Sequence, residues 1–208
     1  MTDALTFYTN PMSRGRICRW MLEEVGCAYA TEVLDYGTTM KGADYLAINP
    51  MGKVPAIRHG QTVVTECAAI CAYLADAFPD AGLAPPLVER GAYYRWLFFA
   101  AGPVEAAVIN KTMGFEAPED KRQMLGYGTF EEVRDTLAKA VSGPGFVAGE
   151  QFSAADVYVG SHIGWGLQFK SIDPRPEFEA YWAKLSGRPA YVRAQEIDDA
   201  LMPAPPDG

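Results

Sequence analysis

The 208-residue sequence predicts an α/β domain followed by an all-α domain. Residues 4–78 alternate short runs rich in aromatic and β-branched residues with stretches where apolar residues recur at helical spacing, which is typical of an α/β unit. A Pro- and Gly-rich linker covers residues 79–86, and strand signals disappear after it. We therefore expect two domains, at residues 1–79 and 87–208.

The first domain should have the order β-α-β-(α)-β-β-α. Its expected strands are at residues 4–8, 29–34, 53–58 and 62–65, and its expected helices at residues 14–25 and 66–78, with a short irregular helix within 35–49. Gly26 ends the first helix and Pro79 ends the last one. The Gly60–Gln61 turn joins the last two strands into an antiparallel hairpin.

The second domain should consist of helices only. They are expected at residues 87–113, 118–141, 153–171, 176–186 and 189–200. Gly102–Pro103 lies inside the first of them, and an internal proline removes a helical hydrogen bond, so a break or kink is expected there. Ser153 and Asp156 have the spacing of a capping box, which should start the third helix rather than contact a substrate.

Composition excludes several classes of function. The net charge is −8 and the 18 Lys and Arg residues are scattered, which argues against nucleic-acid binding. No apolar run is long enough to span a membrane, and the Met1–Asp3 start lacks the basic residues of an export signal, so we expect a cytoplasmic protein. Four cysteines without CxxC spacing and two histidines predict free thiols and no metal site.

The segment TNPMSRGR, residues 9–16, follows the first strand. A glutaredoxin carries Cys-Pro-Tyr-Cys at this place, whereas here Asn10 and Ser13 stand where its two thiols would be. Thiol–disulfide exchange needs a sulfur on the protein, so this turn cannot carry out a dithiol cycle. Any sulfur that reacts here must arrive with a ligand.

Two further segments could bind a peptide-like ligand. A cis bond at Val54–Pro55 would leave the Val54 N–H and C=O free to pair with an extended peptide, although a trans proline on an edge strand is the alternative. The helix start at Glu66–Cys67 could bind a carboxylate, with Glu66 beside it for an ammonium group. The alternative there is that Thr65 caps the helix and Glu66 only complements its dipole.

Three ordered motifs carry a resemblance that covers essentially the whole chain. They are NPMGKVPAI at residues 49–57, TECAAICAYL at 65–74 and FSAADVYVG at 152–160. In these segments the chain resembles the cytosolic, bacterial-type glutathione S-transferase family. The resemblance implies a thioredoxin-like N-terminal domain that binds glutathione as co-substrate, an all-helical C-terminal domain that contributes the electrophile site, and a homodimer.

Residue by residue, the resemblance implies a glutathione site in the first domain. Val54 would pair with the cysteinyl backbone, Pro55 would be cis, and Lys53 would approach the tripeptide. Glu66 and the amide of residue 67 would hold the γ-glutamyl end. Cys67 departs from the family's usual serine, which removes a hydroxyl bond and puts the strength of γ-glutamyl binding in doubt.

Members of this family favour the glutathione thiolate with one hydrogen-bond donor near the end of the first strand. Ser13 is the first candidate, with a helix cap as its structural alternative. Asn10 is the second and Tyr8 the third, although Tyr8 also suits an ordinary strand position. Arg14 and Arg16 place positive charge at a helix start, which is unfavourable unless an anionic ligand or another partner is present.

The resulting prediction is a detoxifying glutathione transferase that activates the thiol for attack on an apolar electrophile. Met12, Asn110 and Trp165 are the candidate residues of the electrophile site, an apolar cleft expected between the domains. A glutathione-dependent disulfide reductase, isomerase or lyase on the same fold is one alternative. A non-catalytic glutathione- or ligand-binding or interaction module is the other.

Overall fold

The computed structural model describes residues 4–202, so the Met1–Asp3 start and the last six residues of the expected second domain lie outside it. The described chain divides into two compact units. The first contains residues 4–81 together with 188–202, and the second contains residues 82–187. Each unit is described by itself.

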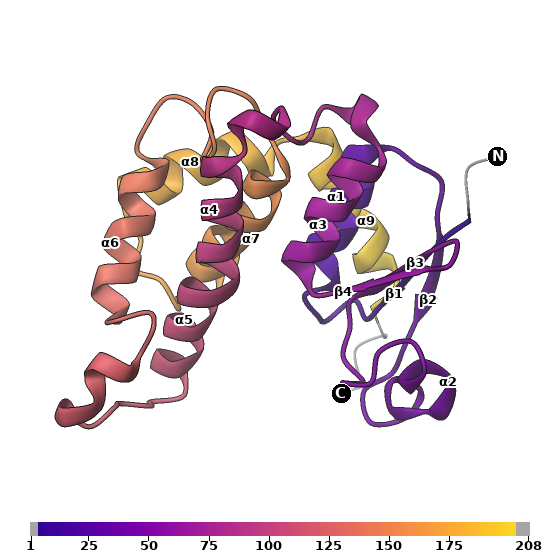
Figure 1. Cartoon of the computed structure of the whole chain (residues 1–208), viewed down its shortest axis with the longest axis horizontal. Helices are drawn as coiled ribbons and strands as arrows, with labels where there is room; N and C mark the ends of the chain where they lie inside the picture. Colours follow the sequence, from indigo (N-terminus) through magenta and orange to yellow (C-terminus); the bar gives the residue numbers. More distant parts are fainter. Residues whose placement is uncertain (1–3, 203–208) are drawn as a thin grey trace, which may run out of the picture. The chain divides into compact units, whose positions relative to one another are not determined.

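The first unit is a four-stranded sheet with helices on both faces (Figure 1). Its elements are β1 (Leu5–Thr9), α1 (Gly15–Val25), β2 (Ala30–Val33), η1 (Thr39–Lys41), α2 (Ala43–Leu46), β3 (Ala56–His59), β4 (Thr62–Thr65), α3 (Cys67–Ala77), η2 (Pro79–Ala81) and α9 (Pro189–Ala200). The strand order is β2-β1-β3-β4, with β1 parallel to β2 and antiparallel to β3. The expected β-α-β-(α)-β-β-α order is confirmed.

Alternation along β1 explains how the sheet is covered. Successive strand residues point to opposite faces. On one face, the guanidinium carbon of Arg19 on α1 lies over the Phe7 ring, 5.0 Å from the ring centre. On the other face, the Tyr8 ring packs against Tyr45 of α2. The third strand begins at Ala56 rather than at the expected residue 53, because Pro55 has no N–H to give to the ladder.

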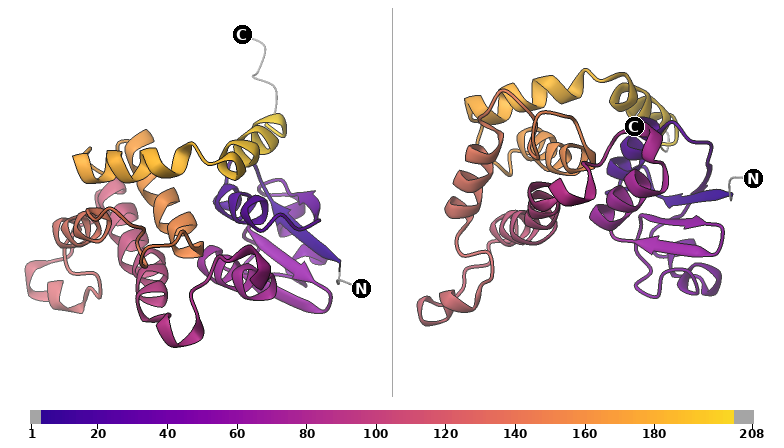
Figure 2. Two further views of the ribbon diagram at one scale, coloured as in Figure 1. Left: turned by 90° about the horizontal axis from the view of Figure 1, so that it is seen from above. Right: turned by 45° about the horizontal axis from the view of Figure 1, so that its top comes forward.

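The C-terminal helix α9 corrects the expected domain boundary. We predicted that residues 189–200 belong to the helical domain, but α9 groups with the first unit. Figure 2 shows α9 alongside α1 in both views. The small buried residues Ala190 and Ala194 allow this close packing, and Asp198 on α9 forms an ion pair with Arg19. Helical periodicity alone does not reveal which partner a helix packs against.

The second unit is helical in its regular elements. They are η3 (Leu87–Glu89), α4 (Gly91–Phe99), η4 (Ala100–Val104), α5 (Glu105–Thr112), η5 (Glu119–Met124), α6 (Phe130–Val141), α7 (Ala154–Gln168) and α8 (Pro176–Ser186). A break or kink was expected at Gly102–Pro103, and the helix does not break there but continues through the π-helical segment η4. The helix expected at 118–141 is in fact two, because a Thr129–Glu132 capping box starts α6 afresh.

Helix α7 is the buried helix of this unit, and its N-terminus carries the expected capping box. Asp156 is fully buried, and its Oδ2 accepts hydrogen bonds from the backbone N–H and the hydroxyl of Ser153, both at 2.9 Å. Its Oδ1 accepts from the Val147 N–H at 2.8 Å and the Tyr181 hydroxyl at 2.6 Å. Burial raises the pKa of Asp156, and these donors lower it in part. The carboxylate therefore has an internal structural role.

Candidate functional site

Asn10 begins the turn that links β1 to α1, and the turn uses its side chain internally. Its Nδ2 donates to the Leu34 carbonyl at 2.8 Å, and its Oδ1 accepts from the Met12 N–H at 3.0 Å. The residue is 5% exposed. An asparagine bonded in this way fixes the turn and ties it to the segment after β2.

Ser13 lies closer to the surface of the same turn and is half-buried. Its hydroxyl accepts from the Gly15 N–H at 2.9 Å and donates to the Asn10 carbonyl at 2.7 Å. The alternative in which Ser13 is the N-cap of α1 is wrong, because Arg14 occupies that position, although the Ser13 side chain does bond to the backbone of the turn. Gly15 has to be glycine here, because a Cβ would come within 1.9 Å of the Thr9 hydroxyl oxygen. The tight turn therefore fixes the Ser13 oxygen while its proton can rotate to another acceptor.

Tyr8 belongs to the core beneath the sheet rather than to the turn. It is 2% exposed and packs with Leu34, Met40, Tyr45 and Ala56. Burial raises the pKa of its phenol. Of the three donor candidates, the structure leaves Ser13 and Asn10 in the turn and places Tyr8 in the core.

The Val54–Pro55 bond is cis, as the resemblance implies. Within residues 4–202, neither the N–H nor the C=O of Val54 makes a hydrogen bond. The preceding carbonyl, that of Lys53, is fixed by the Tyr45 hydroxyl at 2.6 Å and by the Asn49 Nδ2 at 2.8 Å. Val54 is therefore held in place with its backbone available to an extended ligand.

The loop before Val54 contains two residues of the NPMGKVPAI motif, Asn49 and Gly52, to which the sequence analysis gave no role of their own. Asn49 is 4% exposed, and its Oδ1 also accepts from the Met51 N–H at 3.1 Å. Gly52 has a φ of 55°, and a Cβ there would lie 2.9 Å from the Lys41 Nζ and 3.0 Å from the Met40 carbonyl oxygen. The Asn49–Pro50 pair is a turn signal that could have pointed to Asn49. No sequence signal could have indicated the contact between Gly52 and Lys41.

Glu66 stands at the start of α3 with an unusual backbone. Its φ is 67° and its ψ is 121°, and its exposed side chain makes no hydrogen bond or ion pair within the described residues. Non-glycine residues rarely adopt a positive φ, and such strain clusters at functional sites. The alternative in which Thr65 caps the helix is wrong, because Glu66 occupies the N-cap position and no side chain caps the helix.

Cys67 connects this helix start to the opening turn. Its Sγ donates to the Arg14 carbonyl at 3.5 Å, and the side chain is 7% exposed. Cys18 on α1 packs against Cys67 and Cys71, and burial together with these neighbouring thiols raises the pKa of Cys18. Residues 13–14, 54 and 66–67 therefore belong to one unit, with the N-termini of α1 and α3 side by side.

The candidate electrophile residues come from both units. Met12 in the first unit is 57% exposed, and its carbonyl accepts from the Tyr36 hydroxyl at 3.4 Å. In the second unit, the Asn110 side chain donates to the Tyr127 hydroxyl at 3.1 Å, and Trp165 is half-buried on α7. Their grouping into one electrophile site stays a prediction.

The site in the first unit offers hydrogen-bond donors, an extended edge and a carboxylate. Among residues 4–202, no group of three or more His, Cys, Asp or Glu side chains could hold a metal ion. In the same part of the chain, no helix has the length and apolar character needed to cross a membrane. The arrangement fits a zwitterionic peptide that brings its own reactive group.

The comparisons with known proteins agree with this geometry. The family model of the glutathione S-transferase N-terminal domain matches residues 12–77. Glutathione S-transferase F10 of Arabidopsis thaliana is 30% identical over 209 residues, covering 90% of this chain and 94% of that protein. Glutathione S-transferase GstA of Escherichia coli O157:H7 is 27% identical over 164 residues, covering 77% and 78%.

Solved structures extend the similarity over almost the whole chain. A glutathione transferase from Methylococcus capsulatus str. Bath has a TM-score of 0.77 and 31% identity, covering 95% of this chain and 100% of that one. A sphingomonad glutathione S-transferase complexed with glutathione has a TM-score of 0.75 and 27% identity, covering 93% and 98%. With its α/β unit, its helical unit and the site at its two helix starts, the chain belongs to the cytosolic, bacterial-type glutathione S-transferase family.

Proposed function

We propose that this chain is a glutathione transferase that binds glutathione in its first unit and transfers the glutathione sulfur to an apolar electrophile. The observation that carries the proposal is the free Val54 backbone beside cis Pro55, in the same unit as the uncapped start of α3. The sphingomonad relative, which is similar over nearly its whole length, is a complex with glutathione.

In this proposal the tripeptide is held by groups that have no other partner in the described chain. The Val54 N–H and C=O pair with the cysteinyl backbone, as in strand addition. The first N–H groups of α3, which include that of Cys67, bind the α-carboxylate of the γ-glutamyl end, and the Glu66 carboxylate binds its ammonium group. Lys53, which is exposed, supplies a positive charge near the remaining carboxylate.

We assign the thiolate donor to Ser13. A free thiol has a pKa of about 8.5, and each unit by which the site lowers it is worth about 1.4 kcal/mol. The Ser13 hydroxyl already accepts from Gly15, so rotation about its C–O bond is enough to move its proton from the Asn10 carbonyl to a bound sulfur. Asn10 holds the turn in this assignment, since both ends of its amide are engaged.

The chemistry then needs no group beyond glutathione and the second substrate. The thiol proton passes to solvent, and the thiolate electron pair forms the new bond to the electrophilic carbon. The leaving group departs with its electrons, or the electrons move to the far end of an activated double bond. Met12, Asn110 and Trp165 are proposed to contact this electrophile, and detoxification of such compounds is the proposed role.

We further propose a cytoplasmic homodimer. The four cysteines are free thiols, which suits a reducing compartment. Helix α4 and the segment before it expose large apolar side chains, with Val88 94% and Phe98 71% exposed, and a second copy of the chain would cover them. Light scattering at micromolar concentration should give twice the 22.7 kDa mass of the chain. A monomer would contradict this part of the proposal.

The function is tested with a panel of electrophiles and disulfides, comparing wild type with Ser13→Ala and Asn10→Ala. Ser13→Ala should lower kcat by about tenfold or more, which corresponds to one pKa unit of lost thiolate stabilisation, with little change in glutathione affinity. Ser142→Ala is the matched control, because Ser142 also donates to the carbonyl three residues earlier, at 3.0 Å, but lies at the end of α6.

The possible outcomes test three parts of the proposal separately: glutathione binding, the type of reaction and the identity of the thiolate donor. A wild-type chain that does not bind glutathione overturns the proposed function. Binding with turnover of disulfides alone makes the chain a glutathione-dependent reductase. If glutathione binds and the Ser13→Ala rate stays at the wild-type value, the hydroxyl is not the donor.

A further inference from the structure

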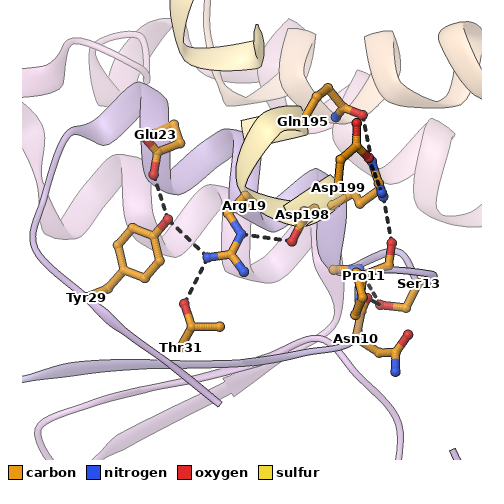
Figure 3. Close-up of polar contacts among 12 residues, drawn as sticks. Asn10, Pro11, Ser13, Arg19, Glu23, Tyr29, Thr31, Gln195, Asp198 and Asp199 are labelled. Atoms are coloured by element: carbon orange, nitrogen blue, oxygen red, sulfur yellow. Dashed lines mark hydrogen bonds and ion pairs between the residues drawn. The ribbon is translucent and has the colours of Figure 1, made fainter. Parts of the chain in front are cut away.

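The Arg16 side chain joins the opening turn to the far end of the chain. Its Nε donates to the Pro11 carbonyl at 2.6 Å, its Nη1 to the Gln195 Oε1 at 2.9 Å and its Nη2 to the Asp199 Oδ1 at 2.6 Å. Figure 3 shows Gln195 and Asp199 on α9 close to Pro11 of the turn. We call this set of three bonds the Arg16 clamp.

The α9 side of the clamp is well anchored. Gln195 and Asp199 are four residues apart, so both side chains lie on one face of α9. Next to them, the fully buried Asp198 accepts from the Arg19 Nε at 3.0 Å, and both side chains of this pair are at most 1% exposed. Separating a buried ion pair of this kind is strongly unfavourable, because each partner is then left as an uncompensated charge, so the pair holds α9 against α1.

The turn side of the clamp is the carbonyl of Pro11, which lies between Asn10 and Ser13 in the sequence. The Asn10 side chain fixes the Met12 N–H, and the Ser13 hydroxyl bonds to the Asn10 carbonyl. Arg16 fixes the Pro11 carbonyl that joins these two parts of the turn. Without this bond, the peptide unit between Pro11 and Met12 would be held only on its N–H side, by the Asn10 Oδ1, and the position of Ser13 would be less narrowly fixed.

We propose that Arg16 is a positioning residue of the thiol-activating turn, and that α9, through Gln195 and Asp199, is a structural part of that site. This inference rests on the proposed function, in which Ser13 contacts the glutathione sulfur. A guanidinium suits the role, since its planar fork can bond to several oxygens in fixed directions, whereas an ammonium group is a point charge. Arg16 therefore acts through the backbone of the turn, with its charge balanced by Asp199.

The test removes the two hydrogen bonds that Arg16 makes to α9, so that no residue of the turn is changed. The double variant Gln195→Ala/Asp199→Ala should lower kcat by about tenfold at saturating glutathione, with less than a twofold change in the glutathione KM, because misplacing a reacting group affects the transition state most. Arg193→Gln is the matched control. It removes another contact of α9 with α1, from the Arg193 Nε to the Glu23 Oε2 at 3.3 Å, far from the turn, and should keep the wild-type kcat.

Two Arg16 variants separate position from charge. Arg16→Gln and Arg16→Lys should lose a similar part of kcat, because lysine keeps the charge but cannot bond to Pro11, Gln195 and Asp199 together. If Arg16→Lys keeps the wild-type kcat while Arg16→Gln loses it, the charge is what matters and the positioning role is wrong. Urea unfolding of each variant shows that the kinetics refer to folded protein.

The outcomes distinguish this inference from the proposed function. If wild type turns over electrophiles, Ser13→Ala lowers kcat and the double α9 variant behaves like Arg193→Gln, the clamp does not position the turn and the inference is overturned. If wild type shows no glutathione-dependent turnover, the proposed function itself fails. A selective loss in the double variant with an unchanged KM supports the inference.

Discussion

Helices α3 and α7 begin in opposite ways, although the sequence marks both starts with a hydroxyl residue followed by an acidic one. At α7 the Asp156 carboxylate is fully buried, and each of its oxygens accepts two hydrogen bonds. At α3 the Glu66 carboxylate is exposed and has no partner within residues 4–202, and its backbone has a φ of 67°. A helix start whose donors are satisfied internally stabilises the fold, whereas one left open can bind an anion.

The two acidic residues should therefore affect different properties, one the stability of the fold and the other the binding of the ligand. Both Asp156 oxygens are fully hydrogen-bonded inside the protein, so replacing Asp156 should lower the free energy of unfolding. Glu66 has no intramolecular bond to lose, so its loss should appear in ligand affinity.

The largest expected effect is that of Asp156→Ala. The substitution leaves the Val147 N–H and the hydroxyls of Ser153 and Tyr181 buried without an acceptor, which should lower the free energy of unfolding by about 3 kcal/mol or more. Urea denaturation measures this change. Glutathione affinity of the folded fraction, measured by calorimetry, should stay at the wild-type value. A strong loss of affinity without a loss of stability would reverse the assignment.

Glu66→Gln should have the opposite profile. Removing the negative charge should weaken glutathione binding by about 2 kcal/mol, or roughly thirtyfold in Kd, because a charge-assisted bond to the ammonium group is lost. The free energy of unfolding should change by less than about 0.5 kcal/mol.

Glu66→Gly tests whether the Glu66 side chain contributes to the stability of the fold. Glycine adopts a positive φ at little cost, so this variant should raise the free energy of unfolding by about 1 kcal/mol while it weakens glutathione binding at least as much as Glu66→Gln. If the glycine variant is clearly less stable than wild type, Glu66 supports the fold by a contact and the contrast between α3 and α7 fails.

A change of pH should have a smaller effect on the free energy of unfolding, through the titration of Asp156. Burial raises the folded-state pKa of Asp156 above its unfolded value near 3.8, so protonation favours the folded chain. This contribution is fully present below the unfolded pKa and is lost as pH rises through the folded pKa. The stability of wild type relative to Asp156→Asn, which does not titrate, should therefore increase as pH falls from 7 toward 4. A decrease over this range would contradict the sign.

Cys67→Ser should give the smallest effect. The serine hydroxyl is a stronger donor than the thiol. In the proposed complex it would donate to the γ-glutamyl group, so glutathione should bind more tightly by about 1 kcal/mol, or roughly fivefold. Cys71→Ser is the matched control one helical turn away, where the side chain is fully buried and glutathione affinity should not change. If wild type and Cys67→Ser bind glutathione with equal affinity, the cysteine at this position does not weaken glutathione binding.

The order of the elements from β1 to α3 and the capping box of α7 could be predicted from the residues alone, because each depends on residues close together in the chain. The cis bond at Val54–Pro55 was implied only by the family resemblance, since the residues themselves left a trans proline open. The sequence could not assign α9 to the first unit or identify the partners of Arg16, because these contacts join residues about 180 positions apart. It also left open whether the start of α3 binds a carboxylate or is capped by Thr65, since both interpretations rest on the same residues. The backbone angle of Glu66 distinguishes them, and only the structure records it.

The position of α9 in the first unit also bears on how the chain is made. During synthesis, residues 4–81 leave the ribosome before the second unit, and residues 188–202 leave after it. Until then Arg19, which is 1% exposed in the finished protein, lacks the Asp198 carboxylate that pairs with it. Domains generally fold in the order in which they are synthesised. Here the glutathione-binding unit, although it begins the chain, can be completed only after the helical unit has been synthesised.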